Sequence, residues 1–376
     1  MNIETKCIHS GKGKDTVARG VNTPIYPSTS HEYLGADEVA YPRYFNTVNQ
    51  KVIEQKICAL EDAEDGIIFS SGMAAISTVL LTFLKAGDHV VLQEEIYGGS
   101  HAFVESFFNR FGISYSFVAT NAESIEAAIK QESRIIYIET PTNPLLSIVD
   151  IQEVAKIAKR NKCVTVIDNT FATPIHQNPI KLGIDIVLHS GTKYLGGHSD
   201  LSCGVVVSTS DLTYKIRKTA TNFGGNINPF TCYLLERSLK TLSIRVKQQT
   251  ENASQIAKFL NKHSEIKNVY YPGLSNHPGH SIACEQMNGF GAMLSFELNI
   301  LNLSADEFMK NLKLIKPAVS LGGIETTICD SARTSHVKVS AEDRARLGIT
   351  DGLLRLSVGI ENAEDLIKDI GQALKE

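Results

Sequence analysis

The chain reads His189-Ser-Gly-Thr-Lys-Tyr-Leu-Gly-Gly-His-Ser-Asp200 directly after an apolar run, Ile184–Leu188, that predicts a buried strand. In this stretch Ser190 and Thr192 flank one lysine, Lys193. A lysine amine can form a Schiff base with an aldehyde, and hydroxyls can bind a phosphate on the same molecule. Pyridoxal phosphate carries both groups. A solvated loop lysine that caps a strand is the simpler interpretation of this stretch alone, so the other motifs must decide.

The overall composition indicates a globular chain with more than one domain. Its 376 residues suggest about two domains, and an apolar share of 43% allows a sizeable core. With a net charge of -4 the chain offers no basic field, so nucleic acid is not an expected partner. No apolar run approaches the roughly 18 residues of a membrane span, and the first residues do not resemble a signal peptide.

The seven cysteines are scattered along the chain, and none of them are spaced as Cys-x-x-Cys. This pattern argues against a disulfide framework and against a metal site, and it fits the reducing cytosol. We therefore expect a cytoplasmic protein without a bound metal.

Potentially functional groups follow several predicted strands in the first half. The strand Gly66–Phe69 runs into Ser70-Ser-Gly-Met-Ala-Ala75, which opens a helix whose first N–H groups can bind an anion. Tyr97 follows the strand His89–Gln93, where it can stack on a planar cofactor, and Asn143 lies in a turn made rigid by prolines. Each feature also has a purely structural explanation: a tight turn, a loop tyrosine, or an asparagine that serves only its own turn.

Asp168 ends another predicted strand, Cys163–Asp168. A buried carboxylate is costly unless it is paired, and a pyridinium N–H is a suitable partner, although Asp168 can also simply cap the next turn. Alternating strands and helices predict an α/β fold with a mostly parallel sheet, where ligands bind beyond the carboxyl ends of the strands. The anion-binding turn, Tyr97, Asn143, Asp168 and Lys193 all fall at such ends, which favours one shared site.

The second half predicts a smaller α+β domain. A long helical stretch near 230–260 contains the expected change of domain, near Ser243. We expect an arm at residues 1–45, a large domain at 46–243 and a small domain at 244–376. Within the small domain Arg355 lies in the apolar strand Leu353–Val358, so it pairs either with the carboxylate of a ligand or with an acidic side chain of the protein.

Taken together, these motifs resemble the cysteine/methionine-metabolism family of pyridoxal-phosphate enzymes. That family includes cystathionine γ-synthase, cystathionine β- and γ-lyases, methionine γ-lyase and O-acetylhomoserine sulfhydrylase. The resemblance runs from the arm to the end of the chain. Its motifs are Ser70-Ser-Gly-Met-Ala-Ala75, Glu139-Thr-Pro-Thr-Asn-Pro144, Val166-Ile-Asp-Asn-Thr-Phe171, the stretch His189–Asp200 and Arg355-Leu-Ser-Val-Gly-Ile-Glu361.

The resemblance implies a fold-type I, aspartate-aminotransferase-like architecture and a homotetramer whose active sites are shared across a dimer interface. It implies that Lys193 binds the cofactor's aldehyde and moves protons, that Asp168 pairs with the pyridine nitrogen, and that Tyr97 stacks on the ring. The implied phosphate ligands are the N–H groups of Gly72 and Met73, the hydroxyls of Ser190 and Thr192, and Tyr41 and Arg43 from a neighbouring subunit. The implied groups around the substrate carboxylate are Asn143, Ser320 and Arg355.

Some positions depart from the family pattern. Ala40 and Val319 stand where cystathionine γ-lyases and γ-synthases often have acids that would hold the distal ammonium of cystathionine. Methionine γ-lyases tend to have valine at the position of Val319, but they carry a cysteine where this chain has Gly99. Tyr44 and Phe45 are expected to add bulk near the entrance of the site.

From this resemblance we expect a carbon–sulfur lyase of the cystathionine β/γ-lyase kind, which acts on a sulfur amino acid and releases a keto acid, ammonia and a thiol. A methionine γ-lyase-like elimination, a γ-replacement synthase and a non-catalytic protein that binds pyridoxal phosphate remain alternatives. Elimination and replacement share their early steps, so the sequence does not separate them. Nor does it assign a target to the cation of Arg333.

Overall fold

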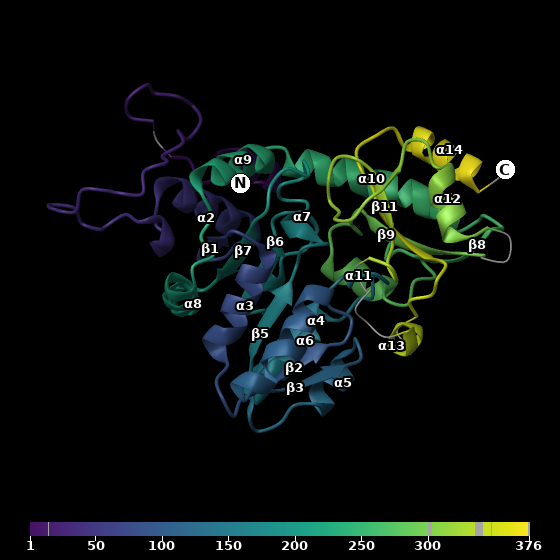
Figure 1. Ribbon diagram of the computed structural model, residues 1–376, viewed down its shortest axis with the longest axis horizontal. Coiled ribbons are helices and arrows are strands. Elements are labelled where there is room, and N and C mark those ends of the chain that lie inside the picture. Colours follow the sequence, from purple (N-terminus) through teal and green to yellow (C-terminus); the bar gives the residue numbers. More distant parts are fainter. Residues whose placement is uncertain (14, 300–302, 335–340, 347, 375–376) are drawn as a thin grey trace.

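Two β-sheets, each with its own helices, make up the protein. The computed structural model describes residues 1–13, 15–299, 303–334, 341–346 and 348–374. A seven-stranded sheet lies in the first part of the chain and a five-stranded sheet in the last part, and the two stand side by side in Figure 1. Among the described residues, none of the helices combines the length and the apolar character that crossing a membrane requires.

The large sheet has the strand order β1-β7-β6-β5-β4-β2-β3. Its strands are β1 (Asp65–Phe69), β2 (His89–Gln93), β3 (Ser114–Val118), β4 (Ser133–Glu139), β5 (Val164–Asp168), β6 (Ile186–Ser190) and β7 (Gly204–Ser208). Only β7 runs antiparallel to its neighbours, while the pairs from β6 through to β3 are parallel. The predicted α/β fold with a mostly parallel sheet is therefore confirmed.

Helices cover both faces of this sheet, because successive side chains of a strand point to opposite faces. On β4, Ile135 and Tyr137 belong to one apolar core and Ile136 and Ile138 to the other. The helices α3 (Gly72–Phe83), α4 (Gly98–Phe107) and α8 (Ser210–Phe223) pack into the first core. The helices α2 (Val48–Glu61), α5 (Ala122–Ala127), α6 (Ile151–Asn161), α7 (Thr173–His176) and α9 (Pro229–Leu239) pack into the second.

The small sheet has the strand order β10-β11-β12-β9-β8. Its strands are β8 (Ile266–Tyr270), β9 (Met293–Leu298), β10 (Lys316–Pro317), β11 (Thr327–Asp330) and β12 (Leu353–Ser357), and the remaining helices here are α11 (His280–Gln286), α12 (Ala305–Asn311), α13 (Ala341–Arg346) and α14 (Ala363–Ala373). Phe296, Phe308 and Leu366 contribute to the separate core of this part.

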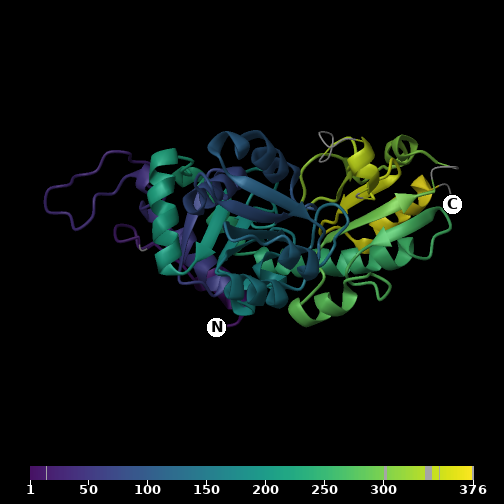
Figure 2. The same ribbon diagram turned by 90° about the horizontal axis from the view of Figure 1, so that it is seen from below.

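One helix, α10 (Leu242–Leu260), connects the two parts of the chain. Its first turns bury Leu242 and Val246 in a core of the large sheet, whereas Ile256 and Leu260 lie in the core of the small sheet. Figure 2 shows this helix running from beneath the large sheet towards the small one. The single helical stretch predicted near 230–260 is wrong in one respect, since α9 ends at Leu239 and α10 begins as a separate helix.

The arm begins with the short helix α1 (Ile3–His9), continues as a long segment without regular structure among its described residues and ends in a 3-10 turn at Pro42–Tyr44. In both ribbon views this segment projects from the end of the molecule opposite the small sheet (Figures 1 and 2). The expected bulk at the site entrance is wrong for Phe45, which is fully buried and packs on Phe69 with ring centroids 5.3 Å apart. Tyr44 is exposed and lies against Tyr41 instead, at a centroid distance of 5.2 Å.

Candidate active site

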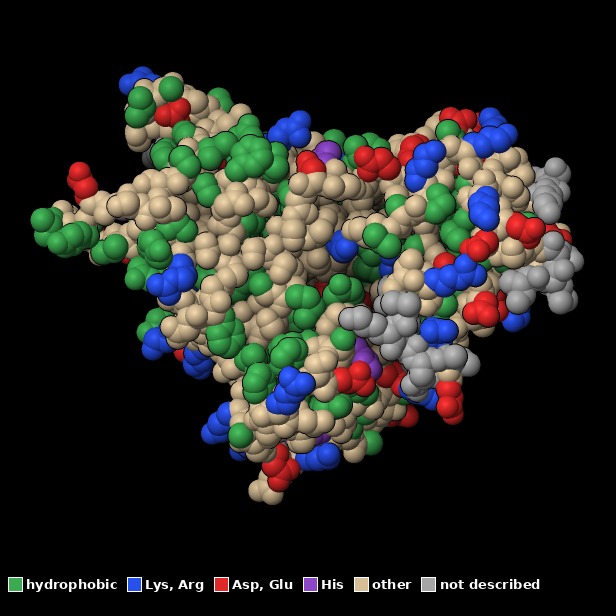
Figure 3. Space-filling view, in the orientation of Figure 1, with side chains coloured by type: hydrophobic (Ala, Val, Ile, Leu, Met, Phe, Trp, Pro, Cys, Tyr) green, Lys and Arg blue, Asp and Glu red, His purple; other side chains and the backbone are tan. Residues whose placement is uncertain are grey.

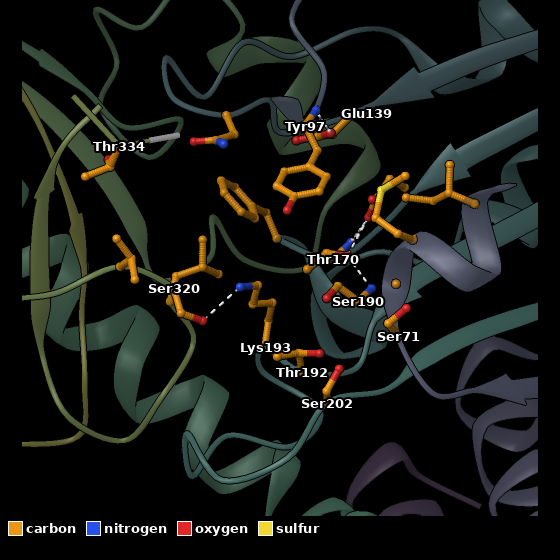
Figure 4. A pocket seen from close by; sticks show the side chains of 18 of the residues that line it. Ser71, Tyr97, Glu139, Thr170, Ser190, Thr192, Lys193, Ser202, Ser320 and Thr334 are labelled. Carbon is orange, nitrogen blue, oxygen red and sulfur yellow. Dashed lines mark hydrogen bonds between the residues drawn. The ribbon is translucent and has the colours of Figure 1, made fainter. Parts of the chain in front are cut away.

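A pocket of about 370 Å³ lies at the carboxyl ends of the parallel strands, between the two sheets. In the space-filling view the surface is hollowed between the two parts of the chain (Figure 3). Figure 4 shows side chains from both parts pointing into this space. The structure thus brings together ten residues that the sequence proposed for one site: Gly72, Met73, Tyr97, Asn143, Asp168, Ser190, Thr192, Lys193, Ser320 and Arg355.

One end of the pocket is built to receive an anion. Helix α3 begins here, and Ser71 Oγ accepts a hydrogen bond from the N–H of Ala74 at 3.1 Å. Helix geometry leaves the preceding N–H groups, those of Gly72 and Met73, without partners inside the helix. Ser190 lies so close that a Cβ atom added to Gly72 would stand 3.1 Å from its hydroxyl oxygen. A larger residue at position 72 would therefore fill the space between the start of α3 and Ser190, where an anion would bind.

The carboxylate of Asp168 is buried at the end of β5. Thr170 donates to its Oδ1 atom twice, from the hydroxyl at 2.5 Å and from the backbone N–H at 3.0 Å. Burial raises the pKa of the Asp168 carboxyl, while these two hydrogen bonds and the nearby charges of His189 and Lys193 act in the opposite direction. A cationic N–H partner within the pocket would complete the stabilisation of this charge.

A second buried acid, Glu139, holds the aromatic wall in place. Its Oε2 atom accepts a hydrogen bond from the backbone N–H of Tyr97 at 2.8 Å, and the Tyr97 ring points into the pocket (Figure 4). Burial and the neighbouring charge of Asp168 raise the pKa of Glu139 well above its usual value. The ring needs a small residue beside it, because a Cβ atom on Gly99 would lie 2.4 Å from it.

The amine of Lys193 stands in the middle of the pocket and donates to Ser320 Oγ at 2.8 Å (Figure 4). Burial and the positive charge of Arg355 lower the pKa of Lys193 to about 8, with Asp168 acting in the opposite direction. A lysine with a lowered pKa is neutral more often near neutral pH, and only the neutral amine can attack an aldehyde. The site therefore favours a nucleophilic lysine.

On the side of the small sheet, Arg355 presents an incompletely used guanidinium. Its Nη1 group donates to Asn143 Oδ1 at 2.7 Å and its Nη2 group to the carbonyl of Ser320 at 3.4 Å. Its Nε atom is buried and has no hydrogen-bond partner among the described residues. Arg355 also lines the pocket, so a ligand carboxylate bound there can pair with its guanidinium.

Three residues named in the sequence analysis lie outside this pocket: Tyr41, Arg43 and Arg333. Arg43 donates to the carbonyl of Thr221 at 2.8 Å, and its guanidinium lies 5.7 Å from the centre of the Tyr41 ring. Neither residue lines the pocket of its own chain. Arg333 forms ion pairs with Asp306 at 2.7 Å and Asp330 at 3.1 Å, which gives it a structural partner on the surface.

Residues 4–375 match the model of the family described as Cys/Met metabolism PLP-dependent enzyme. The chain belongs to this family. Its fold and cofactor class follow from that membership, and the resemblance drawn from the motifs is confirmed. Members use pyridoxal phosphate (PLP), and this chain is a PLP-dependent enzyme of the same family.

Full-length relatives in this family carry different activities in their names. The chain is 45% identical to cystathionine gamma-lyase of Bacillus subtilis (strain 168), with 100% of both chains covered. It is 43% identical to cystathionine beta-lyase of Lactococcus lactis subsp. cremoris (strain MG1363), covering 100% of this chain and 99% of the relative. It is 44% identical to L-methionine gamma-lyase of Fusobacterium nucleatum subsp. nucleatum, covering 100% and 98%.

The fold agrees with solved structures of the family. Cystathionine gamma-lyase from Lactobacillus plantarum, solved in complex with L-serine, superimposes with a TM-score of 0.95 at 38% identity, covering 99% of this chain and 98% of that one. The three activities named among the relatives differ little in identity, so overall similarity does not decide between them.

The residues present fit PLP. The pocket offers N–H groups and hydroxyls for a phosphate, a buried carboxylate for a protonated ring nitrogen, an aromatic face for a planar ring and an amine for an aldehyde. The guanidinium of Arg355 adds a cation for the carboxylate of an amino acid. The phosphate, ring nitrogen, ring face and aldehyde of the cofactor, and the carboxylate of an amino acid, thus each have a matching group in the pocket.

Sequence reasoning missed two residues that shape this site. Thr170 follows Asp168 in the quoted motif, and a hydroxyl two residues after a buried acid is a signal for the turn it forms. Glu139 was quoted as the first residue of its motif but received no role. Its contact with Tyr97 spans 42 positions and gave no local signal.

The lowered pKa of Lys193 predicts how cofactor capture depends on pH. Raising the pH through about 8 converts the ammonium into the reactive neutral amine. We expect the rate at which the cofactor-free protein captures PLP to be half-maximal near pH 8 and to level off about one unit above that, whereas an ordinary lysine titrates only near 10.4. Stopped-flow absorbance measures this rate. A rate that continues to rise up to about pH 10 would contradict the shift.

A second prediction concerns Gly204 on β7. A Cβ atom there would lie 2.1 Å from the carbonyl oxygen of Ser71, so Gly204→Ala must displace the start of α3. We expect PLP to bind about tenfold more weakly, the effect of losing one hydrogen bond to a charged group. Gly66→Ala on the adjacent β1 is the control, since its closest contacts, 3.0 Å from Val206 O and 3.1 Å from Cys58 Sγ, lie away from the pocket. Equal dissociation constants for both variants would refute the prediction.

Proposed function

We propose that this protein is a PLP-dependent carbon–sulfur lyase that converts a cystathionine-type sulfur amino acid into a keto acid, ammonia and a thiol. One observation carries the proposal. A single pocket holds a lysine amine of lowered pKa, a buried carboxylate and an arginine guanidinium. The family relatives named as cystathionine lyases support the same reaction.

In the proposed reaction, Arg355 binds the α-carboxylate of the substrate, and Asn143 holds the guanidinium in place from 2.7 Å. This contact directs the α-carbon towards Lys193, whose neutral amine removes the α-proton. Ser320 Oγ, at 2.8 Å, holds the amine in reach. Bound PLP supplies a ring that accepts the electrons released at the α-carbon.

Asp168 is proposed to remain an anion throughout, with Thr170 as its hydrogen-bond donor. After deprotonation at the α-carbon, a leaving group at Cβ can depart, or a further proton shift at Cβ allows a group at Cγ to leave. Lys193 is the proposed carrier of these protons, because its amine is the basic group held in the middle of the pocket.

A second candidate is elimination from methionine, and Val319 favours it. Val319, Leu321 and Thr334 line the pocket on the side of the small sheet. We propose that the sulfur-bearing end of the substrate lies along this wall. Glu139 and Asp168 are the acids among the described lining residues, and both lie on the large sheet. An apolar thioether therefore suits this wall better than a distal ammonium does.

The deciding experiment is a substrate panel with L-cystathionine, L-methionine, L-cysteine, L-homocysteine and O-acetylhomoserine. We expect turnover of L-cystathionine with a keto acid as product: pyruvate indicates β-elimination and 2-oxobutyrate γ-elimination. Lys193→Ala should lose turnover and the visible absorbance that the bound cofactor shows in the wild type. Consumption of a thiol co-substrate without a keto acid would indicate replacement, and no turnover of any compound would indicate a protein that only binds PLP.

We further propose a homotetramer in the cytoplasm, with active sites shared between subunits. Tyr41 and Arg43 lie outside the pocket of their own chain, and the arm beside them exposes apolar side chains such as Leu34. Exposed apolar surface of this kind is typical of an interface. All seven cysteines are free thiols, which suits a reducing compartment.

Shared sites predict complementation between inactive variants. Co-expressed Arg43→Ala and Lys193→Ala subunits form hybrid dimers in which one site carries both changes and the other carries neither. We therefore expect about a quarter of wild-type activity from random pairing into two-fold symmetric dimers. Co-expressed Lys193→Ala and Asp168→Asn subunits are the control. Each subunit supplies both of these positions to its own site, so every site in a hybrid dimer carries one of the two changes and stays defective. Equal activity in both mixtures, with hybrids verified by distinct tags, would exclude sharing through Arg43.

A further inference from the structure

A buried acid–histidine pair lies behind the pocket and has no role in the reaction described above. Glu61, the last residue of α2, and His189, on β6, are 0% and 2% exposed. Glu61 Oε1 lies 2.5 Å from His189 Nε2. The same oxygen accepts a hydrogen bond from Asn169 Nδ2 at 3.1 Å. Neither Glu61 nor His189 is among the lining residues of the pocket.

This pair connects the ends of two neighbouring strands. Asn169 directly follows Asp168 at the end of β5, and His189 directly precedes Ser190 at the end of β6. One carboxylate from α2 therefore contacts both strand ends, although Glu61 lies 108 positions before Asn169 and 128 before His189. Asn178 Nδ2 donates more weakly to the other carboxylate oxygen, Glu61 Oε2, at 3.5 Å. The two shorter contacts, to Asn169 and His189, are the ones that tie the strand ends to α2, and losing either leaves the buried carboxylate less well paired.

Hydrogen bonds continue from these strand ends into the pocket. The backbone N–H of Ser190 donates to Thr170 Oγ1 at 2.8 Å, and that hydroxyl donates to Asp168 Oδ1 at 2.5 Å. The proposed phosphate ligand and the proposed partner of the ring nitrogen are therefore joined by one short path. A phosphate and a ring nitrogen of one bound PLP molecule would have to reach Ser190 and Asp168 together, so the spacing of the two strand ends matters for binding.

The pair also bears on the charge of Asp168. Burial raises the pKa of this carboxyl, and the charge of His189 is one of the influences that lower it. Asp168 pairs with Leu188 across the sheet, so His189 lies one residue further along and on the opposite face. The groups that act on the charge of Asp168 are thus Thr170 through hydrogen bonds, His189 from the opposite face of the sheet, and Lys193 and Glu139 in the pocket.

We propose that Glu61 and His189 are positioning residues of the cofactor site, which hold the ends of β5 and β6 at the spacing that lets Asp168 and Ser190 engage PLP together. This inference rests on the proposed roles of Asp168 and Ser190. The two residues lie behind the sheet, outside the pocket, and touch neither cofactor nor substrate.

The test compares cofactor affinity in four variants of the full-length protein. His189→Leu removes the contact with Glu61, whereas His189→Gln keeps a donor near the position of Nε2. Glu61→Gln keeps the shape of the side chain but removes its charge. His89→Leu is the matched control, since His89 is also fully buried and links Ser133 at 2.7 Å and Ser116 at 3.0 Å, but near the amino ends of the strands.

Dissociation constants for PLP are measured by absorbance titration of the cofactor-free proteins, after circular dichroism has verified their folding. We expect about tenfold weaker binding for His189→Leu and Glu61→Gln, a loss of the size seen for residues that orient metal ligands. His189→Gln should recover most of the affinity. His89→Leu should lower the melting temperature but bind PLP as the wild type does.

Wild-type affinity in folded His189→Leu or Glu61→Gln would overturn the inference, and so would an equal loss of affinity in His89→Leu. If the leucine variant does not fold, the isosteric Glu61→Gln carries the same comparison with the control. A wild-type protein that does not bind PLP at all would instead refute the proposed function. The two failures are therefore distinguishable.

Discussion

The buried charge of Asp168 at the end of β5 is the constraint on which the site depends. A carboxylate in such a place is costly, and the structure offsets that cost with Thr170 from the same turn and with cationic groups nearby. The same parallel strands deliver Tyr97, Asn143 and Lys193 to one edge, because parallel strands all end on the same side of the sheet. The anion-binding start of α3 completes the arrangement at the far end of the pocket.

This geometry explains why the residues named from the motifs lie together in one pocket. The four motifs of the large sheet each contain or directly follow the end of a strand. An apolar run followed by a polar residue is a local pattern that can be recognised without knowledge of the fold. Strand ends of a parallel sheet then need no further information to converge. The same reasoning led to Arg355, because a lone cation in an apolar strand must find an anion or a strong acceptor, and here it finds Asn143.

What the sequence did not reveal depends on contacts between distant positions. Strand β7 pairs with β1 and β6, and no local motif announced it. The contact of Glu139 with the backbone of Tyr97 and that of Glu61 with His189 are long-range as well. Phe45 was misplaced for the same reason: an aromatic residue in a polar arm gives no sign that it turns back to pack on Phe69. Burial of this kind is decided by tertiary packing alone.

The division between the two sheets separates what binds the cofactor from what meets the substrate. The large sheet supplies Asp168, Tyr97 and the proposed phosphate ligands, whereas the small part supplies Arg355 and the segment around Ser320. Ser320 has a left-handed backbone, with φ of +76°, which is unfavourable for a residue with a side chain and persists only where neighbours hold it. Here Lys193 and Arg355 both contact it.

Because that conformation is held by the reacting lysine and by the carboxylate-binding arginine, the position of Ser320 is tied to the common chemistry of the family. Its neighbour Val319 has no such restraint: its side chain is 72% exposed and lines the pocket without a polar group to anchor it. A change at Val319 can therefore alter which sulfur-bearing group is accepted without disturbing the groups that move protons. Two adjacent positions of one loop thus have different roles: Ser320 is tied to catalysis, whereas Val319 can change selectivity among sulfur amino acids.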